Sequence, residues 1–347
     1  MNILTDFSLG GSNRPKYLQI ADCFIDNISR GNLKNNQRIP SINEFSKAYN
    51  CSRDTVEKGY KVLKERNAIK VIKGKGTYID STKFVASRNV LFLINKLSTY
   101  KLEMYNSFCD NVDSGFQNDF EIYNCDEVLF RNLLDRNFNL YDYYIIMPHF
   151  KIYNGDPNNF SSETIEIIKS IPEEKLVIMD NNELKIDGSI IEIYQDFSLD
   201  VYEALSEGID KIRKYKSVIL VTGGLSVYSY MDKIKKGFIE FCQDHKLHYE
   251  VLEENEDTIA VERGDLFITV NDTDLVKIID AANAEKFELG ADIGVISYNE
   301  TPLKRLLGIA VMSTDFKGMG ATAASMILNN EKGRIRNPFK FIDRVSL

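Results

Sequence analysis

The sequence is poor in the residues that build disulfide frameworks and metal sites. It has only five cysteines and three histidines in 347 residues, and the cysteines are scattered, with no C-x-x-C pair. This pattern excludes a disulfide framework and gives no sign of a zinc site. We therefore expect reduced thiols and a cytoplasmic location, and we find no sequence feature that calls for a metal or a cofactor.

Long apolar runs are also missing. No apolar stretch approaches the length of about 18 residues that a membrane span needs, and the N-terminus lacks a basic segment followed by an apolar one. These absences predict neither a membrane span nor a secretion signal. The length of 347 residues, with 44% hydrophobic and 27% charged residues, fits an ordinary globular protein of two or three domains.

The chain lacks an excess of positive charge everywhere except at its start. Residues 1–80 carry 14 Lys and Arg against 8 Asp and Glu, whereas residues 81–347 carry 29 against 43. A small basic module on an acidic body suits a nucleic-acid contact confined to one end, because neutralising phosphates dominates affinity. Such a balance can also arise by chance, so the interpretation depends on finding a motif in the basic part.

The basic part contains the pattern of a helix-turn-helix with a wing. Apolar residues at a spacing of three and four predict a helix over residues 16–30. A second helix opens at Ser41, where Ser41 and Glu44 form a capping box, and Ser52 caps a third helix after a very short turn. Residues 69–79 then predict a hairpin with two glycines in its turn.

These segments resemble the GntR family of bacterial winged-helix regulators. The similarity covers about residues 14–79 and rests on Tyr17-x-Gln19-Ile20, Arg38-Ile39-Pro40-Ser41-Ile42, Ser52-Arg53-Asp54-Thr55-Val56 and Gly74-Lys75-Gly76-Thr77-Tyr78. The resemblance implies that DNA is held by the start of the second helix, the recognition helix and the wing. The implied DNA-binding residues are Arg38, Ser41, Asn43, Ser52, Arg53, Thr55, Lys58, Lys75, Gly76 and Thr77.

Two observations qualify this assignment. Ser41 and Ser52 would cap their helices in any protein, so their structural role does not depend on DNA. Asn43 stands where the family usually has an arginine, two residues after the serine of the Pro-Ser pair. The operator sequence of typical members therefore cannot be transferred to this chain.

From residue 90 onwards, short apolar strands alternate with amphipathic helices. Unalternating apolar strands between helices indicate parallel sheets that are covered on both faces. We therefore predict an α/β fold of two doubly wound lobes following the winged helix-turn-helix. The strands are expected at 90–95, 120–124, 143–148, 176–180, 190–194, 218–222, 249–253, 266–270, 293–297 and 309–312, and the helices at about 101–116, 127–137, 161–170, 198–214, 229–245, 273–287 and 316–329.

This plan resembles the periplasmic-binding-protein-like ligand domain of LacI-class repressors. The local matches are Asn271-Asp272 after a strand, the strand Gly294-Val295-Ile296-Ser297-Tyr298-Asn299, and Lys236-Gly237-Phe238. One position departs from the class, which often has an arginine three residues before that glycine to grip a sugar. Here the position is Ile234.

The expected ligand site lies at the carboxyl ends of the strands. Ligands of open α/β sheets bind there, and closure of two lobes encloses them. Carboxylates, amides and aromatic rings gather at these ends, which suits a sugar, although any single position could be an ordinary polar loop residue. The predicted ligand-binding residues are Ser98, Tyr100, His149, Asp180, Tyr228, Asn271, Asp272 and Asn299.

Together these features predict a transcriptional regulator and not an enzyme. We expect a DNA-binding domain at 1–80, a linker at 81–89 and a sensing domain at 90–347, in a homodimer that binds operator DNA and a small effector, with a sugar favoured. The alternatives are an α/β enzyme or a sugar-binding protein with a DNA-binding head. No catalytic constellation is present, and the pair Gly223-Gly224 is only a weak sign of a phosphate loop.

Overall fold

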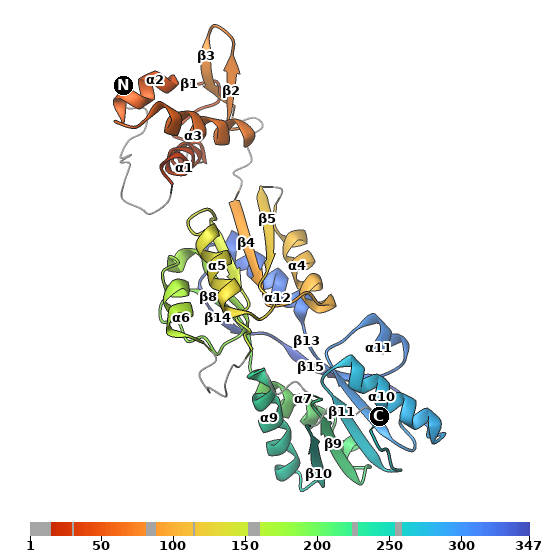
Figure 1. Cartoon of the computed structure of the whole chain (residues 1–347). Coiled ribbons are helices and arrows are strands. Elements are labelled where there is room, and N and C mark those ends of the chain that lie inside the picture. The colour runs from red at the N-terminus through yellow and green to blue at the C-terminus, as the bar shows by residue number, and fades with distance from the viewer. Residues whose placement is uncertain are drawn as a thin grey trace. The chain divides into compact units, whose positions relative to one another are not determined.

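The computed structural model describes residues 15–29, 31–80, 88–113, 115–151, 160–223, 228–253 and 259–347. Residues 15–80, called the head below, form three helices and a small antiparallel sheet of order β1-β3-β2 (Figure 1). These elements are α1 (Lys16–Ser29), β1 (Arg38–Ile39), α2 (Ile42–Ala48), α3 (Arg53–Glu65), β2 (Ile69–Ile72) and β3 (Gly76–Ile79). The winged helix-turn-helix predicted from the sequence is confirmed.

Aromatic packing and helix caps hold the head together. The ring of Phe24 lies 5.7 Å from the rings of both Phe45 and Tyr60 in the buried core of the head. Gly59 lets α3 approach α1 closely, because a Cβ there would lie 2.9 Å from the Tyr17 carbonyl oxygen. The core therefore fixes the angle at which the start of α3 is presented.

The first of two large sheets, with its helices, is called the N-lobe. Its strand order is β14-β8-β7-β6-β4-β5, and β7, β8 and β14 pair in parallel. The strands are β4 (Arg88–Ile94), β5 (Phe116–Ile122), β6 (Tyr143–Ile146), β7 (Leu176–Asn181), β8 (Ile191–Gln195) and β14 (Gly333–Arg336). The helices are α4 (Thr99–Asn111), α5 (Glu127–Asn137), α6 (Ser162–Lys169), the 3₁₀ turn η1 (Glu173–Lys175) and α12 (Phe316–Leu328).

The second sheet, with its helices, is called the C-lobe. Its order is β10-β9-β11-β12-β13-β15, parallel except for β15, which runs antiparallel to β13. The strands are β9 (Ser217–Val221), β10 (Tyr249–Leu252), β11 (Asp265–Thr269), β12 (Gly294–Tyr298), β13 (Ala310–Thr314) and β15 (Phe339–Ile342). The helices are α7 (Phe197–Glu207), α8 (Ile209–Ile212), α9 (Tyr230–Asp244), α10 (Asp272–Ala284) and α11 (Pro302–Leu306).

The chain passes between the lobes three times. It leaves the N-lobe between β8 and α7, returns between β13 and α12, and leaves again between β14 and β15. Glycines allow helices to approach closely in each lobe. A Cβ on Gly320 of α12 would lie 2.1 Å from the Met104 carbonyl oxygen of α4, and one on Gly237 of α9 would lie 2.1 Å from the Ser198 carbonyl oxygen of α7. Gly237 of the Lys236-Gly237-Phe238 run is thus needed for helix packing.

The predicted two-lobed α/β fold is confirmed, with differences in detail. The strand expected at 120–124 already begins at Phe116, β4 begins at Arg88 inside the predicted linker, and β1, β14, β15 and α11 were not predicted. The helix expected over 198–214 divides at Gly208. Gly208 allows the ring of Phe341 on β15 to approach, because a Cβ there would lie 2.9 Å from that ring.

Candidate nucleic-acid interface and ligand pocket

The start of α3 combines exposed cations with a helix cap whose hydrogen bonds are made between Ser52 and Thr55. Ser52 Oγ accepts the Thr55 backbone N–H at 3.2 Å and lies 2.7 Å from Thr55 Oγ1. Arg53 and Lys58 are exposed and belong to no ion pair among the described residues. The Ser52–Thr55 hydrogen bonds therefore fix the end of the helix. Arg53 and Lys58 are available to approach a phosphate or a base edge.

The start of α2 likewise combines a helix cap with an exposed polar side chain. Ser41 Oγ accepts the Glu44 backbone N–H at 3.3 Å, and Glu44 Oε2 accepts the Ser41 backbone N–H at 2.7 Å, which completes the predicted capping box. Asn43 is exposed in the first turn of the helix. Ser41 thus has a confirmed structural role, and a DNA role for Ser41 or Asn43 stays a prediction.

The wing is shaped by glycines with positive φ. Gly74 and Gly76 have φ values of 75° and 114°, and the Lys75 backbone N–H donates to the Ile72 carbonyl oxygen at 2.9 Å. A Cβ on Gly76 would lie 3.2 Å from Arg38 Nε, so the exposed Arg38 side chain packs across the wing at this glycine. Lys75 is exposed and Thr77 is half-buried on the same hairpin.

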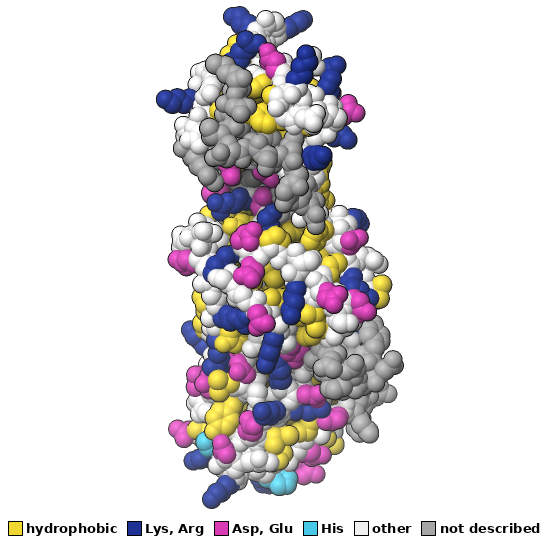
Figure 2. Space-filling view, turned by 90° about the vertical axis from the view of Figure 1, so that its left-hand side faces the viewer, with side chains coloured by type: hydrophobic (Ala, Val, Ile, Leu, Met, Phe, Trp, Pro, Cys, Tyr) yellow, Lys and Arg dark blue, Asp and Glu magenta, His cyan; other side chains and the backbone are white. Residues whose placement is uncertain are grey.

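All ten predicted DNA-contact residues thus lie on the head: on β1, at the start of α2, at the cap and in the first two turns of α3, and on the wing. Blue Lys and Arg side chains gather on the part of the surface that the head contributes in Figure 2, including the end where Figure 1 places the β2–β3 hairpin. This surface has the cationic character that phosphate binding requires.

A cavity of 170 Å³ lies where the carboxyl ends of strands from both lobes meet. It contains six of the eight predicted ligand residues: Tyr100, His149, Asp180, Asn271, Asp272 and Asn299. The other lining residues are Asn95, Lys96, Lys101, Gln195, Phe197, Tyr230, Val270, Tyr298, Lys304 and Phe316. The volume is below the ~300–1,000 Å³ of pockets for drug-sized ligands, so the cavity suits a small molecule.

The N-lobe side of the cavity holds a buried polar cluster around Asp180. Asp180 Oδ2 lies 2.8 Å from both Lys101 Nζ and His149 Nε2, and Gln195 Nε2 donates to Asp180 Oδ1. Thr314 donates in turn to the Gln195 amide oxygen. Each of these side chains is at least nine-tenths buried. The cluster is therefore a fixed part of the cavity wall.

Electrostatics set the charges of this cluster. Burial opposes ionisation of Asp180, but the charges and hydrogen bonds of Lys101 and His149 outweigh it and hold the pKa of the carboxyl well below its usual range. Burial lowers the pKa of His149, and Asp180 opposes that effect only in part. At neutral pH the cluster is an ion pair of Lys101 and Asp180 with a neutral imidazole beside it.

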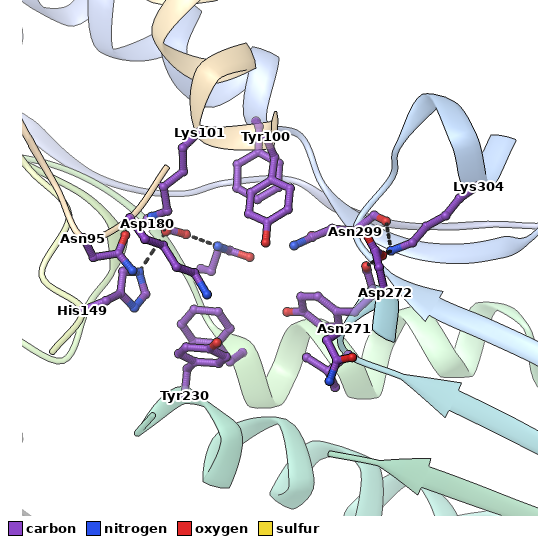
Figure 3. A pocket seen from close by; sticks show the side chains of 16 residues that line it. Asn95, Tyr100, Lys101, His149, Asp180, Tyr230, Asn271, Asp272, Asn299 and Lys304 are labelled. Atoms are coloured by element: carbon purple, nitrogen blue, oxygen red, sulfur yellow. Dashed lines mark hydrogen bonds and ion pairs between the residues drawn. The ribbon is translucent and has the colours of Figure 1, made fainter. Parts of the chain in front are cut away.

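The C-lobe side carries a second ion pair. Lys304 Nζ lies 2.8 Å from Asp272 Oδ1 and also donates to the carbonyl oxygens of Tyr298 and Asn299, at 2.8 and 3.1 Å. Figure 3 shows the Lys101–Asp180–His149 group and the Lys304–Asp272 pair on opposite sides of the cavity, with the Tyr100 hydroxyl pointing between them. Burial and the charges of Asp180 and Asp272 raise the pKa of Tyr100, which keeps its hydroxyl neutral.

Aromatic rings form the remaining walls. Tyr100 stacks on Phe316 with ring centroids 4.9 Å apart, and Phe197 stacks on Tyr230 at 5.4 Å. Ring faces of this kind accept the C–H groups of a sugar or another small apolar surface. The pairs come from α4 and α12 in one case and from α7 and α9 in the other.

Three predicted ligand residues have other roles in the structure. Ser98 lies outside the lining and its Oγ accepts the Lys101 backbone N–H at 3.4 Å, near the start of α4. Tyr228 also lies outside the lining and stacks on Tyr230 at 5.5 Å. Asn271 lines the cavity, but both of its amide atoms bond to Asp274 and cap α10. A ligand-binding role for these three residues stays a prediction.

Comparison with known proteins identifies the two parts of the chain. Residues 16–79 match the family described as bacterial regulatory proteins, gntR family. The head is a gntR-family helix-turn-helix domain. Residues 212–342 match the periplasmic binding protein-like domain. Both resemblances drawn from the sequence are confirmed.

Individual relatives share only part of this chain. Over 90 residues it is 32% identical to the uncharacterized HTH-type transcriptional regulator YurK of Bacillus subtilis (strain 168), covering 26% of this chain and 36% of YurK. Over 67 residues it is 34% identical to the mannosyl-D-glycerate transport/metabolism system repressor MngR of Escherichia coli (strain K12), covering 19% of this chain and 28% of MngR. The chain thus spans about a third of the length of these curated relatives.

The body attached to the gntR-family head has the fold of known regulators. A LacI family transcriptional regulator from Lactobacillus casei, solved with bound sucrose, superposes with a TM-score of 0.59 at 16% identity, over 75% of this chain and 99% of that one. This likeness shows the two-lobed fold. No helix among the described residues is long and apolar enough to cross a membrane.

The departures noted in the sequence have structural explanations. Ile234, at the position of the missing arginine, is completely buried in the C-lobe core. Gly223 is unsuited to cradling a phosphate, because the negatively charged Asp274 carboxylate lies against it, 2.2 Å from where a Cβ would be. Gly224 lies outside the described residues. Among the described residues, no group of three His, Cys, Asp or Glu side chains is placed to hold a metal ion.

A contact between the lobes accompanies the pocket. Glu183 follows β7 in the N-lobe, and its carboxylate accepts a hydrogen bond from Ser229 Oγ at 2.5 Å and pairs with Lys233 Nζ at 3.1 Å at the start of α9. Burial opposes ionisation of Glu183, but these partners lower the pKa of its carboxyl. This contact, called the lobe link below, bridges the two lobes beside the cavity.

Sequence reasoning missed several lining residues for a common reason. Lys101, Lys304 and Phe316 lie in the first turns of helices, not at strand ends. Asn95 and Tyr298 do lie at or just beyond strand ends, and the strand-end rule could have selected them.

Proposed function

We propose that this protein is a transcriptional repressor whose operator affinity is controlled by a small sugar or sugar derivative bound in the cavity. The observation that carries the proposal is the combination, on one chain, of a cationic winged head with a cavity lined by polar and aromatic side chains. MngR is itself a repressor by name, and the Lactobacillus casei regulator was solved with sucrose. Both support the assignment without extending to this chain's own effector.

The DNA-binding half of the proposal rests on the exposed cations of the head. Arg53 and Lys58 at the start of α3 would enter the major groove, while Lys75 and the glycine backbone of the wing would contact phosphates or the minor groove. A homodimer would place two such heads on half-sites of a palindromic operator. The division into a DNA-binding part at 1–80, a linker and a sensing part belongs to this proposal, with the sensing part beginning at β4 (Arg88) and not at residue 90.

The sensing half rests on the cavity. A ligand that contacts the Asp180 cluster of the N-lobe and the Asn299 region of the C-lobe favours the arrangement in which both are close. The three crossings between the lobes are where such a change in arrangement would occur. The head is followed in the chain by β4 of the N-lobe, so a movement of the N-lobe would be passed to the head. Coupling of this type amounts to about 1–3 kcal/mol in operator affinity.

Two measurements on the full chain test this function. Selection of bound sequences from a random DNA library should yield a two-fold symmetric site, bound in a salt-dependent manner. A thermal-shift screen against sugars and sugar phosphates should give at least one ligand that raises Tm, since a ligand at 100 times its Kd stabilises the protein by about 2.7 kcal/mol. Failure to enrich any DNA sequence would contradict the regulator assignment, and silence of the whole ligand panel would contradict the sugar.

A further inference from the structure

We infer that the effector is an uncharged, hydroxyl-rich molecule and not a phosphorylated or acidic one. This inference rests on the proposed function, because it concerns the ligand of the same cavity. It is carried by two observations about the lining: its buried charges are already neutralised within the protein, and the polar atoms left without partners are neutral.

The buried charges of the cavity cancel in pairs. Lys101 is matched by Asp180 and Lys304 by Asp272, each at 2.8 Å. The lysine side chains of both pairs are 5% exposed. A phosphate or carboxylate that bound Lys101 would have to displace Asp180, which is 7% exposed and would then be buried without a partner. The Lys304–Asp272 pair adds less, because the Asp272 side chain is 68% exposed. A neutral ligand leaves both pairs intact.

The remaining lining cation is Lys96, at the edge of the cavity. Its ammonium group lies 5.2 Å from the centre of the Tyr228 ring and has no carboxylate partner among the described residues. Lys96 is half-buried, unlike Lys101 and Lys304. The aromatic ring already stabilises this charge, so the cavity has no buried, unmatched cation that would recognise an anion.

The unpartnered polar atoms of the lining are neutral and come from both lobes. Asn95 Oδ1 in the N-lobe, and Asn299 Oδ1 and the Tyr298 hydroxyl in the C-lobe, are buried and accept or donate no hydrogen bond within the described structure. Asn95 and Tyr298 are 3% and 5% exposed. Buried polar groups without partners are rare in native proteins, and these three belong to side chains that line the cavity. A small turn of each side chain toward the cavity would let a ligand supply the missing hydrogen bonds.

The chemistry of these atoms selects hydroxyl groups. An amide oxygen needs a hydrogen-bond donor, and a tyrosine hydroxyl both donates and accepts. A sugar hydroxyl can satisfy either kind of atom, whereas a phosphate oxygen or a carboxylate can satisfy only a donor. The stacked pairs Tyr100–Phe316 and Phe197–Tyr230 then accommodate the C–H faces of a ring.

Matched pairs of ligands test the inference. The full chain would be titrated calorimetrically with glucose, fructose, ribose, xylose and galactose, each beside its phosphate ester and, where one exists, its uronic acid. We expect a neutral sugar to bind at least about tenfold more tightly than its charged partner, because a buried ion pair must otherwise be broken. Asn95→Ala and Asn299→Ala should each weaken that sugar about tenfold, while Asn283→Ala, exposed on α10, should not.

The possible failures are distinct. Tighter binding of a phosphate or a uronic acid, lost in Lys96→Met, would overturn the inference and leave the sugar effector standing. Equal binding of the neutral sugar by wild type and both asparagine variants would also overturn it, because the unpartnered atoms would then not contact the ligand. If no sugar of either kind binds, the proposed sugar effector fails and this inference fails with it.

Discussion

The head and the cavity both depend on cationic side chains, but they use them in opposite ways. Arg53, Lys58 and Lys75 of the head are exposed and available, whereas Lys101 and Lys304 of the cavity are buried and each bound to an aspartate. Exposed charge gives affinity for a polyanion through release of counterions. Buried, matched charge gives little affinity for an anion and instead fixes the geometry of neutral hydrogen-bonding groups. The exposed cations of the head thus suit a polyanion, whereas the matched charges of the cavity suit a neutral ligand held by hydrogen bonds.

The largest expected effect comes from unmatching a buried charge. Asp180→Ala leaves Lys101 buried without its counterion beside His149, so the free energy of unfolding should fall by about 3–5 kcal/mol. Urea unfolding followed by circular dichroism measures it. Asp187→Ala, at an exposed aspartate in the loop after the same strand, is the control. A loss no larger than the control's would show that the Asp180 cluster is not a stabilising unit.

On the head, removal of one exposed cation should affect DNA binding and leave folding unchanged. Arg53→Ala should weaken operator binding by about 1–3 kcal/mol if it reads a base. If it contacts only a phosphate, the slope of log K against log salt should fall by about one. Fluorescence anisotropy with labelled operator measures both. Lys236→Ala, exposed on α9, should bind as wild type does, and unchanged binding by Arg53→Ala would remove it from the interface.

A backbone change in the wing should have a smaller effect on DNA. Gly76→Ala places a side chain at a φ of 114° and against Arg38, so we expect operator affinity to fall by about 1 kcal/mol, the lower end for a lost contact. Gly31→Ala, at a φ of 75° with no atom within 4 Å of the new Cβ, carries comparable backbone strain away from the wing. Equal operator affinity in the two variants would argue against a role for Gly76 in holding Arg38.

The smallest effect is expected at the lobe link. Glu183→Gln removes the charge that pairs with Lys233, and effector affinity should fall by about 1 kcal/mol or less, as for a partly exposed ion pair. Because the pKa of Glu183 is lowered from its ordinary value of 4.5, the link is complete above that value and weakens as the pH falls below it. Calorimetry at several pH values compares wild type with Glu183→Gln and with the exposed control Glu166→Gln. An unchanged affinity in Glu183→Gln would show that the link does not favour the ligand-bound arrangement.

Local signals made the head predictable, and topology limited the prediction of the cavity. The caps at Ser41 and Ser52 depend on neighbours three residues away, so the sequence contains the whole motif. The pair Lys101–Asp180 joins residues 79 positions apart, and no local pattern reveals it. Strand-end reasoning found Asp180 and Asn299 but not their lysine neighbours in helices. The strands β14 and β15 were missed because they are short and join different lobes after the last helix.

The central claim is that the cavity and the head are coupled, and one measurement tests it most directly. Operator affinity of the full chain would be measured by anisotropy with and without a ligand already shown by calorimetry to bind. The proposed function predicts a change of about 5- to 150-fold, the range of typical allosteric coupling. By reciprocity, operator DNA should change the affinity for that ligand by the same factor. Saturating ligand that leaves operator affinity unchanged would contradict the claim.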